Sequence, residues 1–177
     1  MKNSRTSFTV CWRGEAEMER VNQICKHPLW VESVKKIQAL EQQRIFCRHN
    51  IPHFLDVARL SWIENLEQGL GISKELIYAA AMLHDIGRHL QYTEQIPHDK
   101  GSAMLAEGIL KDCGFSQEEQ EQILSAILQH RTKDTETKNS LAGLLYRSDK
   151  KSRACLFCDA QKDCNWSSEK KNLILTV

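Results

Sequence analysis

Apolar residues recur along most of this chain at the three- and four-residue spacings that are typical of amphipathic helices. The helical pattern begins at Glu15, is interrupted near His27 and Pro28, and resumes over Leu29–Phe46. Because proline lacks a backbone donor and has a fixed φ, the interruption predicts two separate helices in this part of the chain. Residues 1–14 show no clear period, and we expect them to form a poorly ordered arm.

The next two helices are delimited by proline, glycine and serine. Pro52 suits the first turn of a helix, and Gly69 and Gly71 end its apolar pattern. Ser73 has the side chain of an N-cap and predicts the start of the following helix. That helix contains the most informative stretch of the chain, Ala79–Arg88, which reads AAAMLHDIGR.

This stretch ends its apolar run with an adjacent histidine and aspartate, His84 and Asp85. His84 shares a helix face with Ile77 and Ala80, which predicts that the pair is buried. Burying an imidazole beside a carboxylate costs on the order of several kcal/mol unless something pairs with them. The sequence therefore requires a metal ion, a salt bridge or a hydrogen-bond network here, and the residues alone leave all three open.

Three more helices complete the pattern. A polar loop is expected over Arg88–Pro97, and a helix over His98–Gly114. Ser116–Glu119 reads S-x-x-E, a capping box that predicts the start of another helix. After a charged loop over Thr132–Asn139, the pattern is helical again over Leu141–Lys151, and it directs the carboxylate near its end inward.

Composition narrows the class of protein. With 41% hydrophobic residues, 7% aromatic residues, three prolines and eight glycines in 177 residues, we expect a single all-α domain that folds without disulfides. The net charge of +1 gives no global attraction to anionic lipid, and the sequence shows no evident nucleic-acid patch. The longest apolar runs are too short to span a membrane and the N-terminus lacks a signal-peptide core, so we expect a cytoplasmic protein.

Five of the predicted helices carry a histidine or aspartate near one end and on an apolar side. Taken singly, each is most simply a core or surface residue, but their joint occurrence predicts a metal site inside a helical bundle. Imidazole and carboxylate together suit Fe, Mn, Co, Ni or Zn. The candidate ligands are His53, His84, Asp85, His98, His130 and Asp149.

Three segments in order, HFLDVAR around His53, AAMLHDIGR around the doublet and LLYRSDK around Asp149, resemble the HD-domain superfamily of metal-dependent phosphohydrolases. The resemblance covers most of the chain. It implies an all-α, HD-type helical bundle over residues 28–153. An arm and short helix at 1–27 would precede this domain, and a cysteine-bearing tail at 154–177 would follow it.

The resemblance also implies roles for the candidate ligands. One divalent ion would be bound by His53, His84, Asp85 and Asp149. Asp85 would bridge to a second ion or orient the attacking water. His98 in HDKGSA and His130 in LQHR resemble the additional histidines of the dinuclear branch, so we expect two ions. The alternative is one ion, with these two histidines as hydrogen-bond partners or substrate contacts.

The implied substrate is a phosphate ester or phosphoanhydride of a nucleotide-like small molecule. Cations beside the predicted centre would bind its phosphate oxygens. We expect Arg88 and Lys150 to act in catalysis, and Arg131 and His49 to contact substrate. In the implied mechanism, metal-activated water attacks phosphorus, Asp85 orients that water, and an arginine or lysine stabilises the developing charge.

Two other functions share these features. A catalytically silent, nucleotide- or metal-responsive binding protein would keep the pocket without turnover. An HD-fold diiron oxygenase would use an overlapping ligand set to activate O2. The complete ligand set favours the hydrolase.

Seven cysteines in a chain with no export signal indicate reduced thiols rather than a disulfide framework. The tail is expected to form a turn followed by a short polar helix or strand, and it carries Cys155, Cys158 and Cys164 with the spacing C-x2-C-x5-C. Cys47 is a candidate fourth ligand. These residues predict either a structural zinc or an iron–sulfur cluster, and free thiols in a mobile tail are the alternative.

Overall fold

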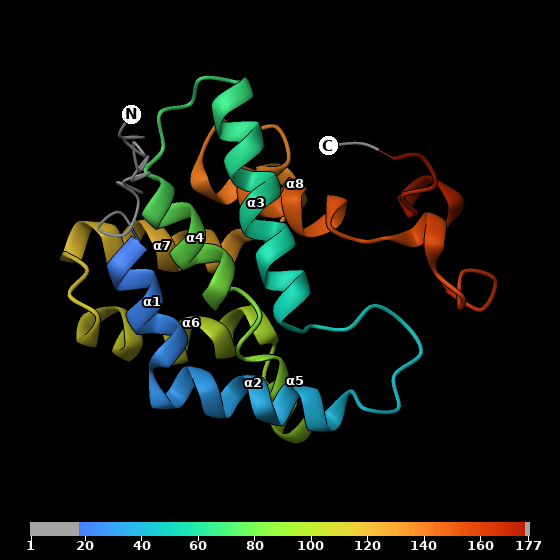
Figure 1. Ribbon diagram of the computed structural model, residues 1–177, viewed down its shortest axis with the longest axis horizontal. Helices are drawn as coiled ribbons and strands as arrows, with labels where there is room; N and C mark the ends of the chain where they lie inside the picture. The colour runs from blue at the N-terminus through green and yellow to red at the C-terminus, as the bar shows by residue number, and fades with distance from the viewer. Residues whose placement is uncertain (1–17, 176–177) are drawn as a thin grey trace, which may run out of the picture.

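The computed structural model describes residues 18–175, and the expected N-terminal arm lies outside this range. The described residues form eight α-helices and no strand, which confirms the all-α fold (Figure 1). The helices are α1 (Glu19–Lys26), α2 (Pro28–Leu40), α3 (Ile51–Glu67), α4 (Lys74–Leu83), α5 (Arg88–Glu94), α6 (His98–Asp112), α7 (Gln117–Gln129) and α8 (Leu141–Lys151). Within residues 18–175 none of these helices combines the length and the apolar character that a membrane crossing requires.

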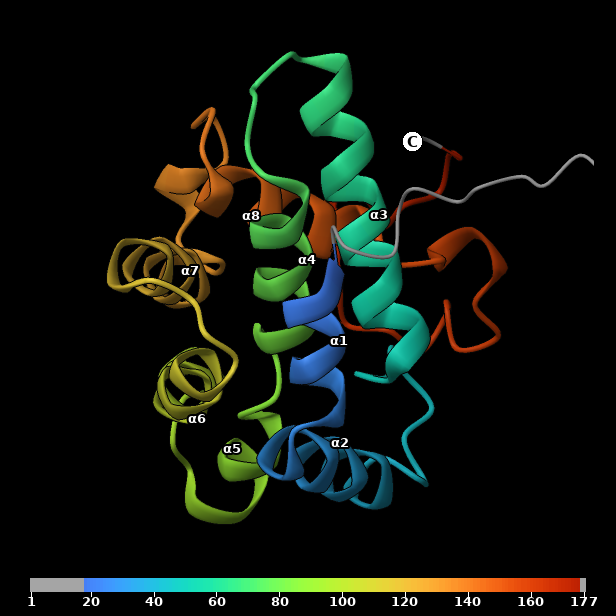
Figure 2. The same cartoon turned by 60° about the vertical axis from the view of Figure 1, so that its left-hand side comes forward.

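Helix α4 lies at the centre of the bundle and contacts α1, α3, α6, α7 and α8 (Figure 2). Its segment Ala79–Leu83 is buried along its whole length. Three consecutive alanines leave room for neighbouring helices to approach closely, so the helix is surrounded on all sides. The end of α4 therefore lies deep in the molecule, and the residues that follow it are buried.

The helix starts agree with the capping residues in the sequence. Asn50 accepts a hydrogen bond from the backbone N–H of His53 at the start of α3, and Ser116 forms the predicted capping box with Glu119 at the start of α7. Ser73 stands at the N-cap of α4 but its side chain makes no capping bond. His27 ends α1 and caps α2, as the interruption at Pro28 predicts.

Two expected boundaries are wrong. The second helix ends at Leu40 rather than Phe46, and residues 41–50 form a loop in which the carboxylate of the C-cap residue Glu41 accepts from the backbone of His49. The expected polar loop after the doublet instead contains α5, whose His89 is buried against α2. Apolar spacing does not reveal this short helix, because its buried residue is a histidine and most of its other residues are polar.

Gly87 joins the doublet to α6 at close range. A Cβ at Gly87 would collide with backbone atoms of Gly101 and Ser102. The backbone N–H of Gly87 donates to the Ser102 hydroxyl over 2.9 Å. Only a residue without a side chain allows α6 to pack directly on the turn after His84 and Asp85.

The tail after α8 has no α-helix or strand within its described part. It contains the short 3-10 turns η3 (Cys155–Phe157) and η4 (Ser168–Lys170), where a short polar helix or strand was expected. The tail and the 41–50 loop lie on the same side of the bundle (Figures 1 and 2).

Candidate metal centre

The ends of five helices bring the six predicted ligands together. His53 lies in the first turn of α3, His98 opens α6, and Asp149 lies near the end of α8. The C-caps of α4 and α7 are His84 and His130, and Asp85 follows the first of them. His84, Asp85, His98 and His130 are buried, whereas His53 and Asp149 are partly exposed.

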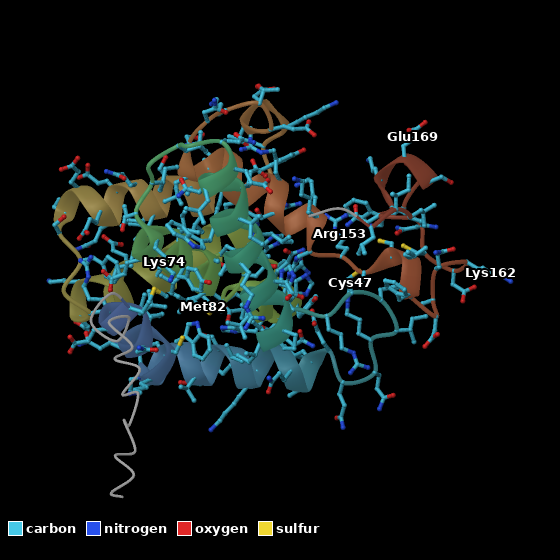
Figure 3. All side chains as sticks on the ribbon, turned by 45° about the horizontal axis from the view of Figure 1, so that its top comes forward. Cys47, Lys74, Met82, Arg153, Lys162 and Glu169 are labelled. Carbon is cyan, nitrogen blue, oxygen red and sulfur yellow. The ribbon has the colours of Figure 1, made fainter. Side chains whose placement is uncertain are left out.

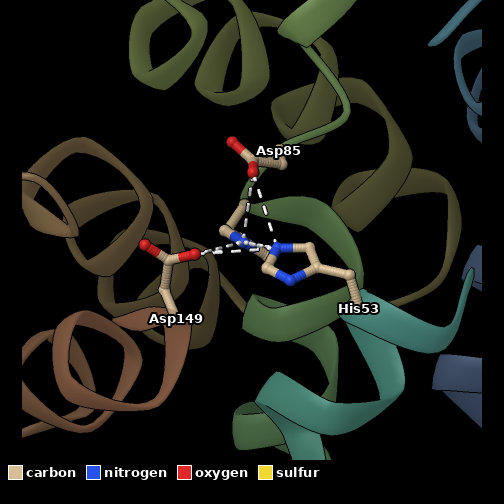
Figure 4. Close-up of side chains that lie close together, drawn as sticks. His53, Asp85 and Asp149 are labelled. Atoms are coloured by element: carbon tan, nitrogen blue, oxygen red, sulfur yellow. Dashed lines mark hydrogen bonds and ion pairs between the residues drawn. The ribbon is translucent and has the colours of Figure 1, made fainter. Parts of the chain in front are cut away.

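The first group of ligands consists of His53, His84, Asp85 and Asp149, whose nearest ligand atoms all lie within 4.8 Å of one another (Figure 4). The Nε2 atoms of His53 and His84 are 3.3 Å apart. Asp149 Oδ1 lies 3.6 Å from the first of these nitrogens, and Asp85 Oδ2 lies 3.5 Å from the second. Separations of this size are those of atoms that share one ion.

The second group consists of Asp85, His98 and His130. Asp85 Oδ1 lies 3.4 Å from His98 Nε2 and 3.9 Å from His130 Nε2. The two groups therefore share Asp85, with Oδ2 directed at one and Oδ1 at the other. Among residues 18–175 these are the two sets of at least three side chains whose ligand atoms converge in this way.

The hydrogen bonds around the histidines fit metal binding. His84 Nδ1 and His130 Nδ1 each face a backbone carbonyl, of Ala81 and Ile127, so each must donate its proton there. His53 Nδ1 lies 3.2 Å from the Ser152 hydroxyl. With Nδ1 protonated, Nε2 of each ring carries a lone pair directed at the centre.

Ser152 is held in place to receive this bond. Its hydroxyl donates to the backbone carbonyl of Asp149 over 2.8 Å. In its contact with His53, Ser152 is therefore the acceptor, and His53 Nδ1 carries the proton. When both rings are neutral, the Nε2 lone pairs of His53 and His84 face each other, an arrangement that a cation between them relieves. Burial lowers the pKa of His84, but Asp85 and Asp149 outweigh burial and raise it, so in the absence of a metal ion a proton on His84 takes this place. In addition, Asp85 Oδ1 is buried with no hydrogen-bond partner in the structure, as expected for an oxygen whose partner is an ion.

Charge in the site favours ionised carboxylates and a neutral second-group histidine. Burial alone would raise the pKa of Asp85, but the charges of Arg88 and His84 outweigh burial and hold it well below its usual range. Burial also opposes ionisation of Asp149, yet the hydrogen bond and charge of His84 lower the pKa of that carboxyl. Burial lowers the pKa of His98 to about 3, so that its imidazole is neutral at neutral pH.

A second layer of side chains, which the sequence analysis did not predict, supports the site. Glu41 is 3% exposed and accepts hydrogen bonds from the backbone N–H and the Nδ1 of His49. The Tyr92 hydroxyl donates to the same carboxylate over 2.6 Å. Gln91 Oε1 contacts His98 Nδ1 and directs its Nε2 at Asp85. No spacing signal marks these residues, because Glu41 lies at a helix end and the other two lie in the segment expected to be a loop.

The predicted cationic residues fall into two sets. Arg88 Nη2 lies 3.5 Å from Asp85 Oδ2 and donates to His49 Nε2 over 2.8 Å, so these two residues border the centre. Lys150 instead lies over the ring of Tyr146, at 3.3 Å from its centroid. Arg131 is half-exposed and pairs with Asp99 over 3.5 Å. The structure therefore brings Arg88 and His49 to the site. The side chains of Lys150 and Arg131 contact Tyr146 and Asp99 instead.

A cavity of about 540 Å³ opens beside the centre and reaches the tail. His49, His53, Arg88 and Asp149 line its inner end. Its outer wall carries cationic, aromatic and thiol side chains from the 41–50 loop and the tail, among them Arg44, Arg48, Lys170, Phe46, Phe157, Trp166, Cys47, Cys155, Cys158 and Cys164. The cavity thus combines a metal-ligating end with a basic and aromatic wall.

The fold and the site define a helical domain in which an ordered set of histidines and aspartates could hold metal ions. Residues 50–163 match the HD domain family, and the chain belongs to this family. Its superfamily is that of metal-dependent phosphohydrolases.

Two relatives extend this comparison. An uncharacterized protein of Clostridium beijerinckii is 44% identical over 155 residues, which cover 88% of this chain and 97% of that protein. Ribonuclease Y of Oleidesulfovibrio alaskensis is 29% identical over 128 residues, which cover 72% of this chain but 22% of the ribonuclease. No solved structure matches the chain.

Proposed function

We propose that this protein is a hydrolase with a dinuclear metal centre that cleaves a phosphate ester or phosphoanhydride of a nucleotide-like small molecule. The observation that carries the proposal is the position of Asp85, whose two oxygens face two separate groups of histidines. A carboxylate in this position suits the bridging role in a two-metal site. Mixed imidazole and carboxylate ligands suit Fe, Mn, Co, Ni or Zn.

The divalent ions would supply Lewis acidity that activates water and polarises the phosphoryl group. The chain itself supplies position and charge. Asp85 stays ionised and orients the reacting groups, while Arg88 offers its guanidinium at the inner end of the cavity. Glu41 fixes the His49 ring, and His49 holds Arg88 through its Nε2. Arg88 is therefore preorganised to bind a phosphoryl oxygen and to stabilise the charge that develops there.

The outer wall of the cavity supports a nucleotide-like substrate. Arg44, Arg48 and Lys170 would attract further phosphate groups, and the aromatic rings of Phe46 and Trp166 provide faces for a base. A cavity of about 540 Å³ is of the size that holds a small organic ligand. The similarity to a protein named Ribonuclease Y makes a phosphodiester in RNA the second candidate substrate.

Metal content and phosphate release together test the proposal. The parent protein would be purified without a metal-affinity tag, reconstituted with Mn²⁺ or Fe²⁺, and assayed for metal per chain by elemental analysis. Phosphate release would be measured with a phosphomonoester, nucleoside mono-, di- and triphosphates, and a short RNA. The variant His98→Ala/His130→Ala removes the histidines of the second group only, and Arg131→Ala is a matched control at an exposed cation.

We expect about two ions per parent chain and about one in the double variant. Hydrolysis should fall by roughly two or more powers of ten in that variant, because one ion no longer assists the reaction. The Arg131→Ala control should retain both ions. Full metal loading without hydrolysis of any phosphate compound would favour a binding protein, and consumption of O2 would favour an oxygenase. Either result would contradict the proposal.

A further inference from the structure

The tail has almost no hydrophobic core of its own. Among residues 152–175, Ala160 is the one apolar residue that is classed as buried, with 8% of its surface exposed. Phe157, Ile174 and Leu175 are more than 70% exposed. A segment that is irregular and buries so little apolar surface needs another source of stability, and metal ions or disulfides are the usual ones.

The cysteines supply the material for such a staple. Cys155, Cys158 and Cys164 from the tail and Cys47 from the 41–50 loop line the outer wall of one cavity. All four cysteines are reduced in the structure. Cys47 is exposed, and the three tail cysteines are half-buried. Figure 3 shows Cys47 beside Arg153, where the tail begins. Four thiols thus gather at the place where two irregular segments meet.

Hydrogen bonds give the first two tail cysteines a defined turn. The backbone N–H of Cys158 donates to the carbonyl of Cys155 over 3.2 Å. Gln161 closes the turn on both sides, since its backbone N–H donates to the Cys158 carbonyl and its side-chain amide donates to the Cys155 carbonyl. A tight C-x2-C turn is the arrangement that presents two thiolates to one tetrahedral ion.

Cys47 is close enough to the tail thiols for their charges to interact. Burial raises the pKa of Cys47, and Cys155 and Cys158 raise it further. Arg153 acts in the opposite direction and lowers it. The guanidinium of Arg153 lies over the Trp166 ring, 3.8 Å from its centroid, and would offset the negative charge of a metal bound by four thiolates.

We propose that Cys47, Cys155, Cys158 and Cys164 bind one structural Zn²⁺ that fastens the tail to the 41–50 loop. Within residues 18–175, no three cysteine sulfurs lie within 4.8 Å of one another, so binding requires the thiols to close around the ion. Because the three tail thiols do not converge either, closure requires rotation of all four cysteine side chains, together with small movements of the tail and of the loop that carries the exposed Cys47. Binding releases the thiol protons and orders both segments.

The consequence reaches the metal centre that the histidines form. The tail begins directly after Ser152, which binds His53, and its cysteines share one cavity with His53 and Asp149. A zinc ion at the cysteines would therefore fix the outer wall of the cavity without occupying the histidine centre.

Cobalt spectroscopy separates the two sites. Protein produced in defined medium with Co²⁺ in place of Zn²⁺ should show a thiolate-to-cobalt charge-transfer band in the near ultraviolet, which a histidine and carboxylate site does not produce. The variants are Cys155→Ser/Cys158→Ser and Cys47→Ser, with Cys25→Ser as a matched control at a half-buried cysteine on α1. The variant His98→Ala/His130→Ala should keep the band in full.

We expect the band in the parent and in the Cys25→Ser control, its loss in the double cysteine variant and its weakening in Cys47→Ser. Zinc content of the zinc-grown parent should exceed that of the double cysteine variant by about one ion per chain. The parent spectrum decides the question even if a variant fails to fold. A parent without the thiolate band, or one that contains iron with acid-labile sulfide instead of zinc, would overturn the proposal.

Discussion

Glu41 is a buried carboxylate that supports the candidate metal centre without being one of its ligands. Its carboxylate receives the His49 ring, the His49 backbone and the Tyr92 hydroxyl, and so connects α2, the 41–50 loop and α5. Burial alone would raise the pKa of Glu41, but the hydrogen bonds from His49 and Tyr92 lower it to about 2. Glu41 is therefore ionised at neutral pH and holds His49 beside Asp85.

The first prediction concerns this carboxylate. In Glu41→Gln, the amide NH2 cannot accept a hydrogen bond, so at least one donor on His49 or Tyr92 loses its partner. We expect the free energy of unfolding to fall by about 1–3 kcal/mol, measured by urea titration. Tyr92→Phe is the milder control, since it removes one bond at a partly exposed ring. A Glu41→Gln protein as stable as the parent would show that this network does not contribute to folding.

At the scale of the helices, two glycines should respond in opposite ways to alanine, one in the turn between α4 and α5 and the other inside α6. Gly87 has no room for a Cβ because of the backbone of α6, whereas Gly108 on the exposed side of α6 has no neighbouring atom within 4 Å. We expect Gly87→Ala to lose about 1–3 kcal/mol and to displace His98 from Asp85, with loss of metal from the second group. Gly108→Ala should gain up to about 1 kcal/mol.

Thermal unfolding and elemental analysis of the two variants test this pair. The contact between the doublet turn and α6 would be unimportant if both substitutions changed stability equally. Gly108→Ala adds the same methyl group at an open position, so it controls for the general effect of replacing glycine by alanine without a collision.

The sequence predicted those elements whose signals are local. Pro52 in a first turn, the capping box at Ser116 and the break at Pro28 are signals from neighbouring residues, and the structure contains a helix start at each of them. The inward faces of α3, α4 and α7 follow from apolar spacing, and this brought His53, His84 and His130 within the predicted site. At the end of α2 and in α5, Glu41 and His89 bind Tyr92 and Ser33, partners that are distant in the sequence.

The same distinction holds in the candidate site. All six predicted ligands converge, because a histidine or aspartate on an apolar face must point into the core. The supporting residues Gln91 and Tyr92 could not be found, since a polar residue in a polar segment carries no sign of what it will contact. Lys150 follows Asp149 directly, but adjacent helix residues point in different directions, and its ammonium lies on Tyr146 instead.

At the scale of the whole molecule, Arg20 connects the first helix to the bundle. Its guanidinium contacts Glu75 of α4 over 2.6 Å and Glu119 of α7 over 2.7 Å. The hydrogen bond from Arg20 is the main reason that the pKa of Glu119 falls to about 2. A folded pKa below that of the unfolded chain, roughly 4.3, means that the pair stabilises the fold above that pH. This stability is lost as the pH falls from there toward 2.

We therefore expect Glu119→Gln to lower the free energy of unfolding by about 1 kcal/mol at pH 7, since the pair is partly exposed and screened by salt. Glutamine retains the capping-box geometry, but its amide NH2 cannot accept, so the substitution removes the charge and one of the two hydrogen bonds from Arg20. The difference from the parent should disappear as the pH approaches 2, measured by urea unfolding across the pH range. Glu118→Gln, one residue earlier on the exposed face of α7, is the control. A difference that is constant with pH would rule out the ion pair as its source.

The last prediction follows from the position of the metal centre where α3, α4, α6, α7 and α8 meet. An ion held by ligands from five helices binds the folded chain only, so its removal must lower stability by mass action. At a free metal concentration of roughly 100 times the dissociation constant this amounts to about 2.7 kcal/mol, or a fall in melting temperature of about 5–10 °C for a chain of this size. Calorimetry with and without a chelator measures it.

The variant His53→Ala/His84→Ala/His98→Ala/His130→Ala removes the histidines of both ligand groups but leaves the cysteines intact. Its melting temperature should respond to the chelator by much less than that of the parent, and any remaining response reports the metal held by the tail. Adding Cys155→Ser/Cys158→Ser should abolish that remainder. If the chelator shifts the parent and the histidine variant equally, then the stabilising ion is not held by the five helices, and the cysteines alone account for it.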